Sequence, residues 1–231
     1  MTLKAVFLDI GNTLLHEVPS RYAIYAETAR RRGAQASEDE MRTLMRRAHG
    51  ELPRVLDGAF RYSDPWFEAF VERIFADYLG VAPAELPGLT AELFERFESR
   101  ATFRTFPGAR ELLGELRDLE LGLGVVSNWS ARLPRVLEAL ELAPCFDFVL
   151  SSALEESEKP EPEMFRRALA LAGVSAAEAL HAGDDPVRDG GARELGIEFV
   201  LVDHRGAHPG ADARRVPDLP ALGAHIRSRL P

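Results

Sequence analysis

The sequence predicts an α/β protein in which a parallel sheet carries helices on both faces and is interrupted by an inserted bundle of α-helices. Two observations support this fold class. From residue 107 onward, short apolar runs alternate with helical segments, as they do in repeated βα units. Between residues 20 and 100, four helical segments follow one another with no strand pattern between them. We therefore expect a core made of residues 1–15 and 101–231, and a helical insert of residues 16–100.

The core elements are predicted from their apolar runs. A buried strand is expected over residues 4–9, because the residues before Asp9 are continuously apolar and Gly11 follows shortly after. The other strands are expected over residues 121–126, 146–150, 179–182 and 197–202, with helices over 108–119, 130–141, 161–172 and 186–195. Residues 203–216 are expected to form a loop, and residues 217–231 a closing helix. Short apolar strands alternating with helices imply a parallel sheet that is covered on both faces.

The helices of the insert are predicted from their N-terminal signals. A serine precedes each of the first three at positions 20, 37 and 63, and serine is a preferred helix N-cap. Ser37 and Glu40 have the spacing of a capping box, and Pro65 fits the first turn of the third helix. The four helices are expected over residues 20–33, 37–48, 63–80 and 90–99. Their apolar faces predict a small bundle.

Composition limits the classes of partner. Of 231 residues, 46% are hydrophobic and 28% are charged, which is typical of a globular protein. The formal net charge of −9 argues against nucleic acid or an anionic membrane as the main partner, and a small-molecule substrate is expected. The single cysteine, Cys145, excludes an intrachain disulfide and is expected to be a small buried side chain. With neither a membrane-spanning run nor a signal peptide in the sequence, a cytoplasmic protein is expected. Oligomeric state is not indicated.

Polar or charged residues follow several of the apolar runs. They are, in chain order, Asp9, Ser127 with Asn128, Lys159, and Gly183-Asp184-Asp185 with Asp189. In open α/β sheets, ligands and reacting groups gather at the carboxyl ends of the strands. Each motif alone is also explained by a helix cap or a solvated charge. Their joint occurrence favours a site.

Each of these residue types suits phosphate and metal chemistry. Several carboxylates at one strand end repel one another unless a cation is present, and Mg²⁺ prefers such hard oxygen ligands. The hydroxyl of Ser127, the amide of Asn128 and free backbone N–H groups can bind an anion. The Lys159 ammonium can neutralise a phosphate or orient the carboxylate of Asp9.

In this order, the motifs resemble those of the haloacid dehalogenase superfamily of aspartate-nucleophile hydrolases, across nearly the whole chain. The insert resembles that family's helical cap, as in its phosphoglycolate phosphatase-like and dehalogenase-like subgroup. The resemblance implies a Rossmann-like core in which Asp9 is the nucleophile and forms an aspartyl intermediate. It implies that Thr13 braces the nucleophile loop, and that Ser127, Asn128 and Lys159 hold the transferring phosphoryl group.

The same resemblance implies a Mg²⁺ cofactor. The ion would be held by Asp9, by the backbone carbonyl of Gly11 and by Asp184. Asp185 or Asp189 would contact the ion through a water molecule, or would contact its ligands without touching the ion.

Gly11 departs from the pattern of the family's phosphatases. These usually carry a second aspartate two residues after the nucleophile, which protonates the leaving group and later activates water. Such a group is worth about 10²–10⁴ in rate. Glycine at this position is expected to suit a positive φ in a tight loop.

Three interpretations follow from Gly11. The first is a Mg²⁺-dependent phosphatase whose acid/base comes from elsewhere, or whose leaving group needs none, as in an acyl phosphate. The second is a 2-haloacid dehalogenase, since halide leaves without a proton. The third is a regulatory protein that binds phosphate and Mg²⁺ with little turnover. The retained Asp184, Asp185 and Asp189 imply a metal site and favour the first interpretation.

Substrate selection is assigned to the insert. The loop of residues 57–66 lies between two predicted helices, and Arg61, Tyr62 and Trp66 are its candidate selective side chains. Arg61 can pair with a substrate carboxylate or phosphate. Trp129, directly after Asn128, is a candidate to line one side of the pocket. The alternative is that Trp66 belongs to the core of the insert and that Arg61 is solvated.

Overall fold

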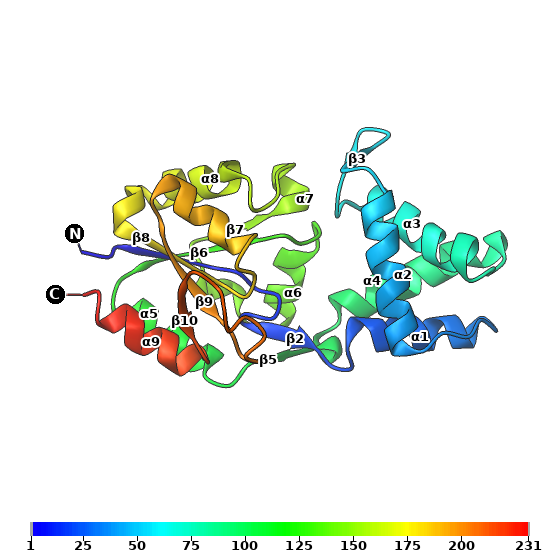
Figure 1. Cartoon of the computed structure of the whole chain (residues 1–231), viewed down its shortest axis with the longest axis horizontal. Helices are drawn as coiled ribbons and strands as arrows, with labels where there is room; N and C mark the ends of the chain where they lie inside the picture. Colours follow the sequence, from blue (N-terminus) through cyan, green and yellow to red (C-terminus); the bar gives the residue numbers. More distant parts are fainter. Residues whose placement is uncertain (1, 231) are drawn as a thin grey trace.

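A six-stranded sheet organises the larger of two lobes in the computed structural model, which describes residues 2–230 (Figure 1). Its order is β10-β9-β8-β1-β6-β7, and every pairing in it is parallel. The strands are β1 (Ala5–Leu8), β6 (Gly122–Ser127), β7 (Phe148–Ser151), β8 (Ala179–Gly183), β9 (Glu198–Val202) and β10 (Arg214–Val216). This confirms the predicted α/β fold with a parallel, Rossmann-like sheet.

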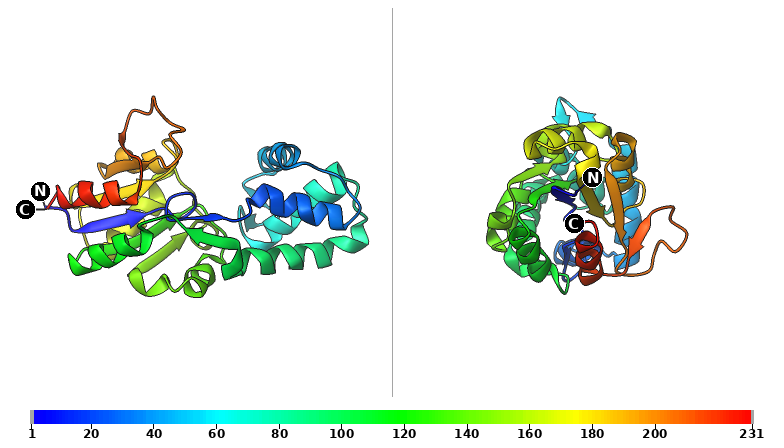
Figure 2. Two further views of the ribbon diagram at one scale, coloured as in Figure 1. Left: turned by 90° about the horizontal axis from the view of Figure 1, so that it is seen from below. Right: turned by 90° about the vertical axis from the view of Figure 1, so that its left-hand side faces the viewer.

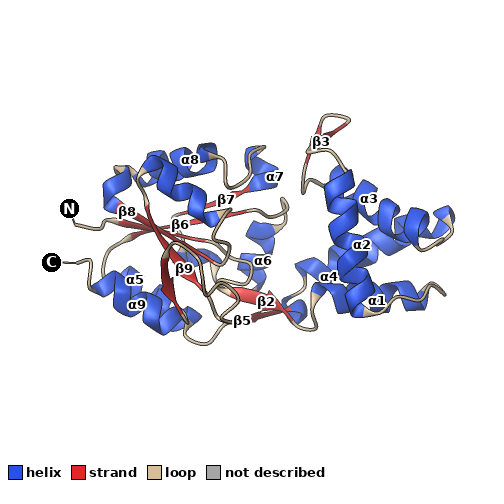
Figure 3. Cartoon of the chain, viewed as in Figure 1, coloured by secondary structure: helices blue, strands red, loops and turns tan. Residues whose placement is uncertain are grey.

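Helices cover both faces of this sheet, as the views from different sides show (Figures 2 and 3). They are α5 (Ala109–Asp118), α6 (Leu133–Ala139), α7 (Ser152–Glu155), α8 (Pro162–Ala172) and α9 (Leu219–Arg227). Short 3₁₀ segments occur at Arg100–Thr102, Ala143–Cys145, Ala176–Glu178 and Asp189–Leu195. The sheet and these helices form the core lobe.

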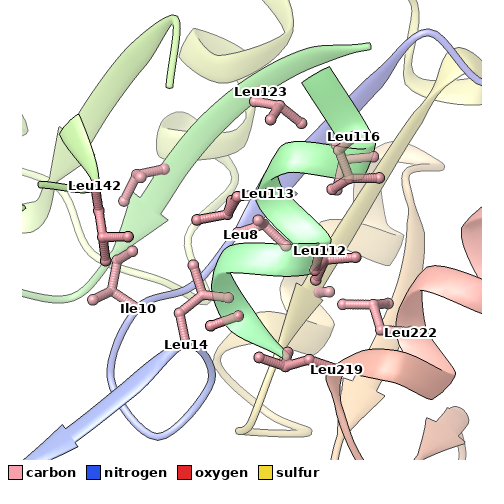
Figure 4. Close-up of a cluster of buried hydrophobic side chains, with 14 of the residues drawn as sticks. Leu8, Ile10, Leu14, Leu112, Leu113, Leu116, Leu123, Leu142, Leu219 and Leu222 are labelled. Carbon is pink, nitrogen blue, oxygen red and sulfur yellow. The ribbon is translucent and has the colours of Figure 1, made fainter. Parts of the chain in front are cut away.

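Strand alternation divides the core lobe into two apolar layers. In β1, Val6 and Leu8 face the layer under α5, α6 and α9, whereas Ala5 and Phe7 face the layer under α8. The buried positions of α5 recur at three- and four-residue spacing, which is why this segment is helical. Leucines of α5, α9 and the strands meet in one cluster (Figure 4).

The helical lobe contains α1 to α4 and has an apolar cluster of its own. Its elements are α1 (Arg21–Arg31), α2 (Glu38–Glu51), α3 (Asp64–Glu72) with a π-helical continuation (Arg73–Tyr78), a 3₁₀ turn (Pro83–Glu85), α4 (Leu86–Glu98), and a hairpin of β3 (Val55–Leu56) and β4 (Ala59–Phe60). The predicted N-cap at Ser20 and the capping box of Ser37 with Glu40 are both present. Ser63 precedes α3 but makes no side-chain capping bond.

The two lobes are joined by an antiparallel ladder of β2 (Leu15–Glu17) and β5 (Phe103–Thr105). These segments run side by side between the lobes (Figures 1 and 2). Phe97 of α4 packs against the apolar clusters of both lobes. That residues 16–100 form a separate domain stays a prediction.

Several local predictions differ from the structure. Residues 186–195 were expected to form an α-helix, but only a 3₁₀ segment forms, since Gly190 and Gly191 are poor helix formers. The expected loop of residues 203–216 ends in β10, which adds a strand beside β9. Cys145 is half-buried rather than enclosed.

Two corrections concern the helical lobe. The helix α4 begins at Leu86 rather than at residue 90, with a proline in its first turn. The expected loop of residues 57–66 starts with a hairpin, because Asp57 and Gly58 take φ values of 49° and 83°, as a two-residue hairpin turn requires. Among residues 2–230, no helix has the length and apolarity needed to cross a membrane.

Candidate active site

A cleft of about 580 Å³ lies where the carboxyl edge of the sheet faces the helical lobe. Both lobes line it: Asp9, Lys159 and Asp184 come from the core lobe, and Tyr22 and Phe94 come from the helical lobe. Its volume is in the range of sites for small molecules. The four predicted strand-end motifs all contribute residues to this one cleft.

Lys159 links two buried carboxylates at the floor of the cleft. Its Nζ lies 2.8 Å from Oδ1 of Asp9 and 2.5 Å from Oδ1 of Asp189. All three side chains are at most 8% exposed. Burial alone would lower the pKa of Lys159, but the charges of Asp189 and Asp9 outweigh it and raise that pKa. Lys159 therefore carries a fixed positive charge next to Asp9.

Asp9 is oriented by donors from three segments of the chain. Ser127 Oγ and Lys159 Nζ donate to its Oδ1, at 2.9 and 2.8 Å, and Thr13 Oγ1 donates to its Oδ2 at 3.1 Å. β1 places Asp9, β6 places Ser127, and the turn after β1 places Thr13. The carboxylate is thus held in one orientation at the strand end, as a nucleophile requires.

Asn128 contacts the backbone of Lys159. Its Nδ2 donates to the carbonyl oxygen of Lys159 at 2.9 Å, and its Oδ1 accepts from the Lys159 N–H at 2.8 Å. These two bonds use the polar atoms that were predicted to bind phosphate. In this structure, the side chain of Asn128 positions the lysine turn.

Three carboxylates are arranged as a candidate metal site. Asp9, Asp184 and Asp189 each offer an oxygen, and these oxygens lie within 4.8 Å of one another. Burial and the charges of Asp9 and Asp189 raise the pKa of Asp184 to about 8. A divalent cation would relieve this repulsion, and three hard oxygen donors suit Mg²⁺. Gly11 also lines the cleft, so its carbonyl is available at the same edge.

The other two predicted acidic residues have different surroundings. Asp189 is one of the three carboxylates of the cluster, and its Oδ2 accepts from the backbone N–H of Asp185 at 3.0 Å. Its expected role behind the metal ligands stays a prediction. Asp185 lines the cleft, but its Oδ1 accepts from the backbone N–H groups of Val187 and Arg188. Asp185 therefore caps the turn after β8.

His181 supports Asp189 and was missed from the sequence. It is fully buried in β8, and its Nε2 lies 2.8 Å from Oδ1 of Asp189. Burial lowers the pKa of His181, whereas the pKa of Asp189 is lowered, against the effect of burial, by Lys159 and His181. Nε2 of His181 is therefore placed to donate to the carboxylate of Asp189. A histidine in an otherwise apolar strand, two residues before Gly183, was the available signal.

The substrate-selection candidates divide into two pairs. Tyr62 and Trp129 line the cleft. Trp66 is 0% exposed in the apolar cluster of the helical lobe, and its Nε1 donates to the carbonyl of Pro53. Arg61 donates to Glu158 at 3.1 Å rather than facing the cleft. The prediction that Arg61 and Trp66 contact substrate is thus not supported.

Further lining residues come from helices that the sequence could not orient. They include Tyr22, Tyr25, Met45, Phe67, Leu93, Phe94 and Phe97. The helical lobe therefore presents aromatic side chains, together with the charged Arg21, Glu38 and Arg42 and with Glu17 of the adjoining β2, to the charged edge of the sheet.

Comparisons with known proteins agree with this geometry. The family model of the haloacid dehalogenase-like hydrolases matches residues 3–196. The chain belongs to this family. It is 33% identical to a phosphoserine phosphatase of Thermus thermophilus, with 94% of each chain covered.

Solved structures of haloacid dehalogenase-like proteins share the whole architecture. A HAD phosphatase from Thermococcus onnurineus is similar with a TM-score of 0.68 and 26% identity, over 97% of this chain and 98% of that one. A 2-haloacid dehalogenase from Pseudomonas syringae is similar with a TM-score of 0.69 and 25% identity, over 98% and 99%. The fold thus serves both chemistries, and the site must decide between them.

In this haloacid dehalogenase-like hydrolase, ion pairs hold the helical lobe against the core lobe. Arg61 and Arg54, beside and before the β3–β4 hairpin, pair with Glu158 and Glu161, which flank Lys159. A separate pair joins Arg132, before α6, to Asp64 of α3 at 2.7 Å. Charge pairs therefore join the two lobes at two separate places.

Proposed function

We propose that this hydrolase is a Mg²⁺-dependent phosphatase that acts on a small phosphorylated metabolite through an aspartyl phosphate on Asp9. The arrangement of Asp9 beside the Lys159 ammonium and two further carboxylates carries the proposal. It supplies a nucleophile, a fixed cation and a site for a metal ion, which together neutralise a transferring phosphoryl group. The relative named phosphoserine phosphatase supports phosphate release as the reaction type, and not a particular leaving group. The single cysteine suits a reducing compartment and supports a cytoplasmic location.

The residues of the chain account for both halves of the reaction. One oxygen of Asp9 attacks phosphorus, and the bond from phosphorus to the leaving oxygen breaks, with its electron pair going to that oxygen. Water then attacks the aspartyl phosphate, which releases phosphate and restores the carboxylate. Lys159 and Ser127 offer donors to the phosphoryl oxygens. Bound Mg²⁺, held by Asp9, Asp184 and Asp189, would add positive charge at the same place.

The carboxylate cluster also discriminates between the candidate chemistries. Breaking a carbon–halogen bond requires no metal ion. Asp184 would then add a third negative charge within 4.8 Å of Asp9 and Asp189, which already share the single ammonium of Lys159. A phosphoryl group brings several negative oxygens, which a cation site is suited to receive. The cluster therefore favours phosphatase over dehalogenase activity.

One assay tests the proposal. The protein is incubated with p-nitrophenyl phosphate, acetyl phosphate or 2-chloropropionate, each with Mg²⁺ and with EDTA. We expect phosphate release that requires Mg²⁺ and that falls by about 10³-fold or more in Asp9→Asn, since removing a catalytic nucleophile has effects of this order or larger. Circular dichroism checks that the variant is folded.

The other outcomes assign the alternatives. Chloride release that is indifferent to EDTA would identify a dehalogenase. Mg²⁺-dependent binding of a phosphate analogue such as vanadate, without turnover of any of the three compounds, would identify a regulatory or binding protein.

The interlobe ion pairs should affect substrate affinity. In Arg54→Gln/Arg61→Gln, the pairs with Glu158 and Glu161 are lost, and we expect KM to rise about 3- to 10-fold with a smaller change in kcat. Partly exposed ion pairs contribute about 0.2–1 kcal/mol each, which corresponds to this range. Steady-state kinetics with acetyl phosphate measures the change. The matched control is Asp77→Asn, which breaks the Arg73–Asp77 pair inside the helical lobe and should leave KM unchanged.

A further inference from the structure

The indole of Trp129 fills the space into which a side chain at position 11 would extend. A Cβ added to Gly11 would lie 3.2 Å from Cζ3 and 3.8 Å from Cε3 of this ring. The expectation of a positive φ at Gly11 is wrong, because Asn12 is the residue of this loop in the left-handed region, with a φ of 56°. The neighbouring indole therefore limits the space for a side chain at position 11.

Trp129 is fixed in this place by its contacts. Its backbone N–H donates to Oγ of Ser152 at 3.0 Å, and its carbonyl accepts from the Ser152 hydroxyl and from the N–H of Ala153. Its ring packs against Phe103, with the centroids 5.9 Å apart. A side chain at position 11, next to the nucleophile loop, would thus require the Trp129 ring to shift by at least a few tenths of an ångström.

Four of the other titratable groups that line the cleft have partners of their own. Glu17 pairs with Arg21, Glu38 accepts from Ser20, the Tyr62 hydroxyl lies 3.1 Å from His49, and Asp185 caps its turn. Glu17, Glu38, Tyr62 and Asp185 are therefore engaged with other parts of the protein. Of the two further tyrosines in the lining of the cleft, Tyr22 lies under the guanidinium of Arg42, and burial raises the pKa of Tyr25. His16 packs against Phe106, and burial lowers its pKa, so its imidazole is largely unprotonated at neutral pH.

We propose that this site provides no proton to the leaving group, and that it selects phosphorylated compounds whose leaving oxygen is weakly basic and is carried on an apolar or aromatic body. Acyl phosphates and aryl phosphates share this chemistry. Aromatic side chains that line the cleft from both lobes, among them Phe67, Phe94 and Trp129, would pack against such a body. This inference rests on the proposed phosphatase activity and narrows its substrate class.

The chemistry balances without a general acid. In the first step, Asp9 displaces the leaving oxygen, which departs as a carboxylate or phenolate with the bonding electrons and takes no proton. In the second step, water attacks the aspartyl phosphate. Its two protons remain on the product, released as dihydrogen phosphate, while Asp9 returns as a carboxylate. An alkyl phosphate would instead have to expel an alkoxide, which is as basic as hydroxide.

The dependence of rate on the leaving group tests the inference. We would measure kcat/KM at saturating Mg²⁺ for acetyl and benzoyl phosphate, for a series of substituted phenyl phosphates, and for O-phosphoserine as an alkyl ester. We expect kcat/KM to fall steeply as the leaving-group pKa rises, with O-phosphoserine about 10²- to 10⁴-fold below acetyl phosphate, the range that a general acid is worth. We also expect benzoyl phosphate to have a lower KM than acetyl phosphate.

Two double variants of equal bulk test whether position 11 lacks a proton donor or only lacks space. The double variant Gly11→Asp/Trp129→Ala introduces a carboxyl group and makes room for it. We expect it to raise kcat/KM for O-phosphoserine by about 10²-fold and to weaken the dependence of kcat/KM on leaving-group pKa. Gly11→Asn/Trp129→Ala has the same bulk without a transferable proton, and it should keep the steep dependence. If these variants fail to fold, the wild-type dependence alone decides.

Contrary results are distinguishable. A shallow dependence in the wild type, a dependence that steepens in His16→Asn, or a folded Gly11→Asp/Trp129→Ala protein that keeps the wild-type slope would overturn the inference. Any of these results would leave the phosphatase proposal standing, because phosphate would still be released. Absence of phosphate release from every substrate would instead reject the proposed function itself.

Discussion

Lys159→Met should lower kcat/KM by about 10²- to 10³-fold and destabilise the Mg²⁺-free protein by about 3–5 kcal/mol. The catalytic loss is that of one charged donor to the phosphoryl oxygens. The stability loss follows because Lys159 is 2% exposed and pairs with both Asp9 and Asp189, so its removal leaves two carboxylates buried without a cation. Urea unfolding measures the stability, and phosphate release measures the activity.

Added Mg²⁺ should restore more stability to this variant than to the wild type. A cation bound by Asp9, Asp184 and Asp189 would replace part of the missing charge, and ligand binding to the folded state stabilises it by mass action. The control is Lys4→Met, because Lys4 is an exposed lysine that pairs with Glu178 on the surface. A Lys159→Met protein with wild-type stability and turnover would contradict the role assigned to the ammonium.

The cluster itself was predictable because it depends on topology alone. Parallel strands present their carboxyl ends at one edge, so residues that follow β1, β6 and β8 must meet there once the sheet is known. Asp9, Ser127 and Asp184 needed no information beyond the apolar runs that precede them. Lys159 was counted among the strand-end signals, but it follows β7 only after the short helix α7.

Side-chain direction was not predictable. Asn128 and Arg61 are polar residues near the cleft, but one bonds the backbone of Lys159 and the other pairs with Glu158. These partners are 31 and 97 residues away in the sequence, and only the packed structure brings them together. The ladder of β2 with β5 was missed for the same reason, since each strand is three residues long and its partner lies beyond the whole helical lobe.

Position 183 has no room for a side chain, because the carboxylate of Asp189 occupies that space. Gly183→Ala should reduce kcat/KM by about 10²-fold or more and weaken Mg²⁺ binding. A Cβ at this position would lie 2.1 Å from Cγ of Asp189, so the carboxylate must leave its place between Lys159 and His181. Overpacking costs about 1–3 kcal/mol, and the broken hydrogen bonds add to this loss. Isothermal titration with Mg²⁺ and urea unfolding measure the two effects.

The matched control for Gly183→Ala is Gly114→Ala. Gly114 lies within α5, and a Cβ there meets no atom within 4 Å, so alanine should stabilise the helix by about 0.5–1 kcal/mol and leave Mg²⁺ binding unchanged. The same added methyl group thus has opposite expected effects at two positions, and only one of them touches the carboxylate cluster. If Gly183→Ala bound Mg²⁺ and turned over substrate like the wild type, Asp189 would not be needed in its observed position. The metal site would then rest on Asp9 and Asp184 alone.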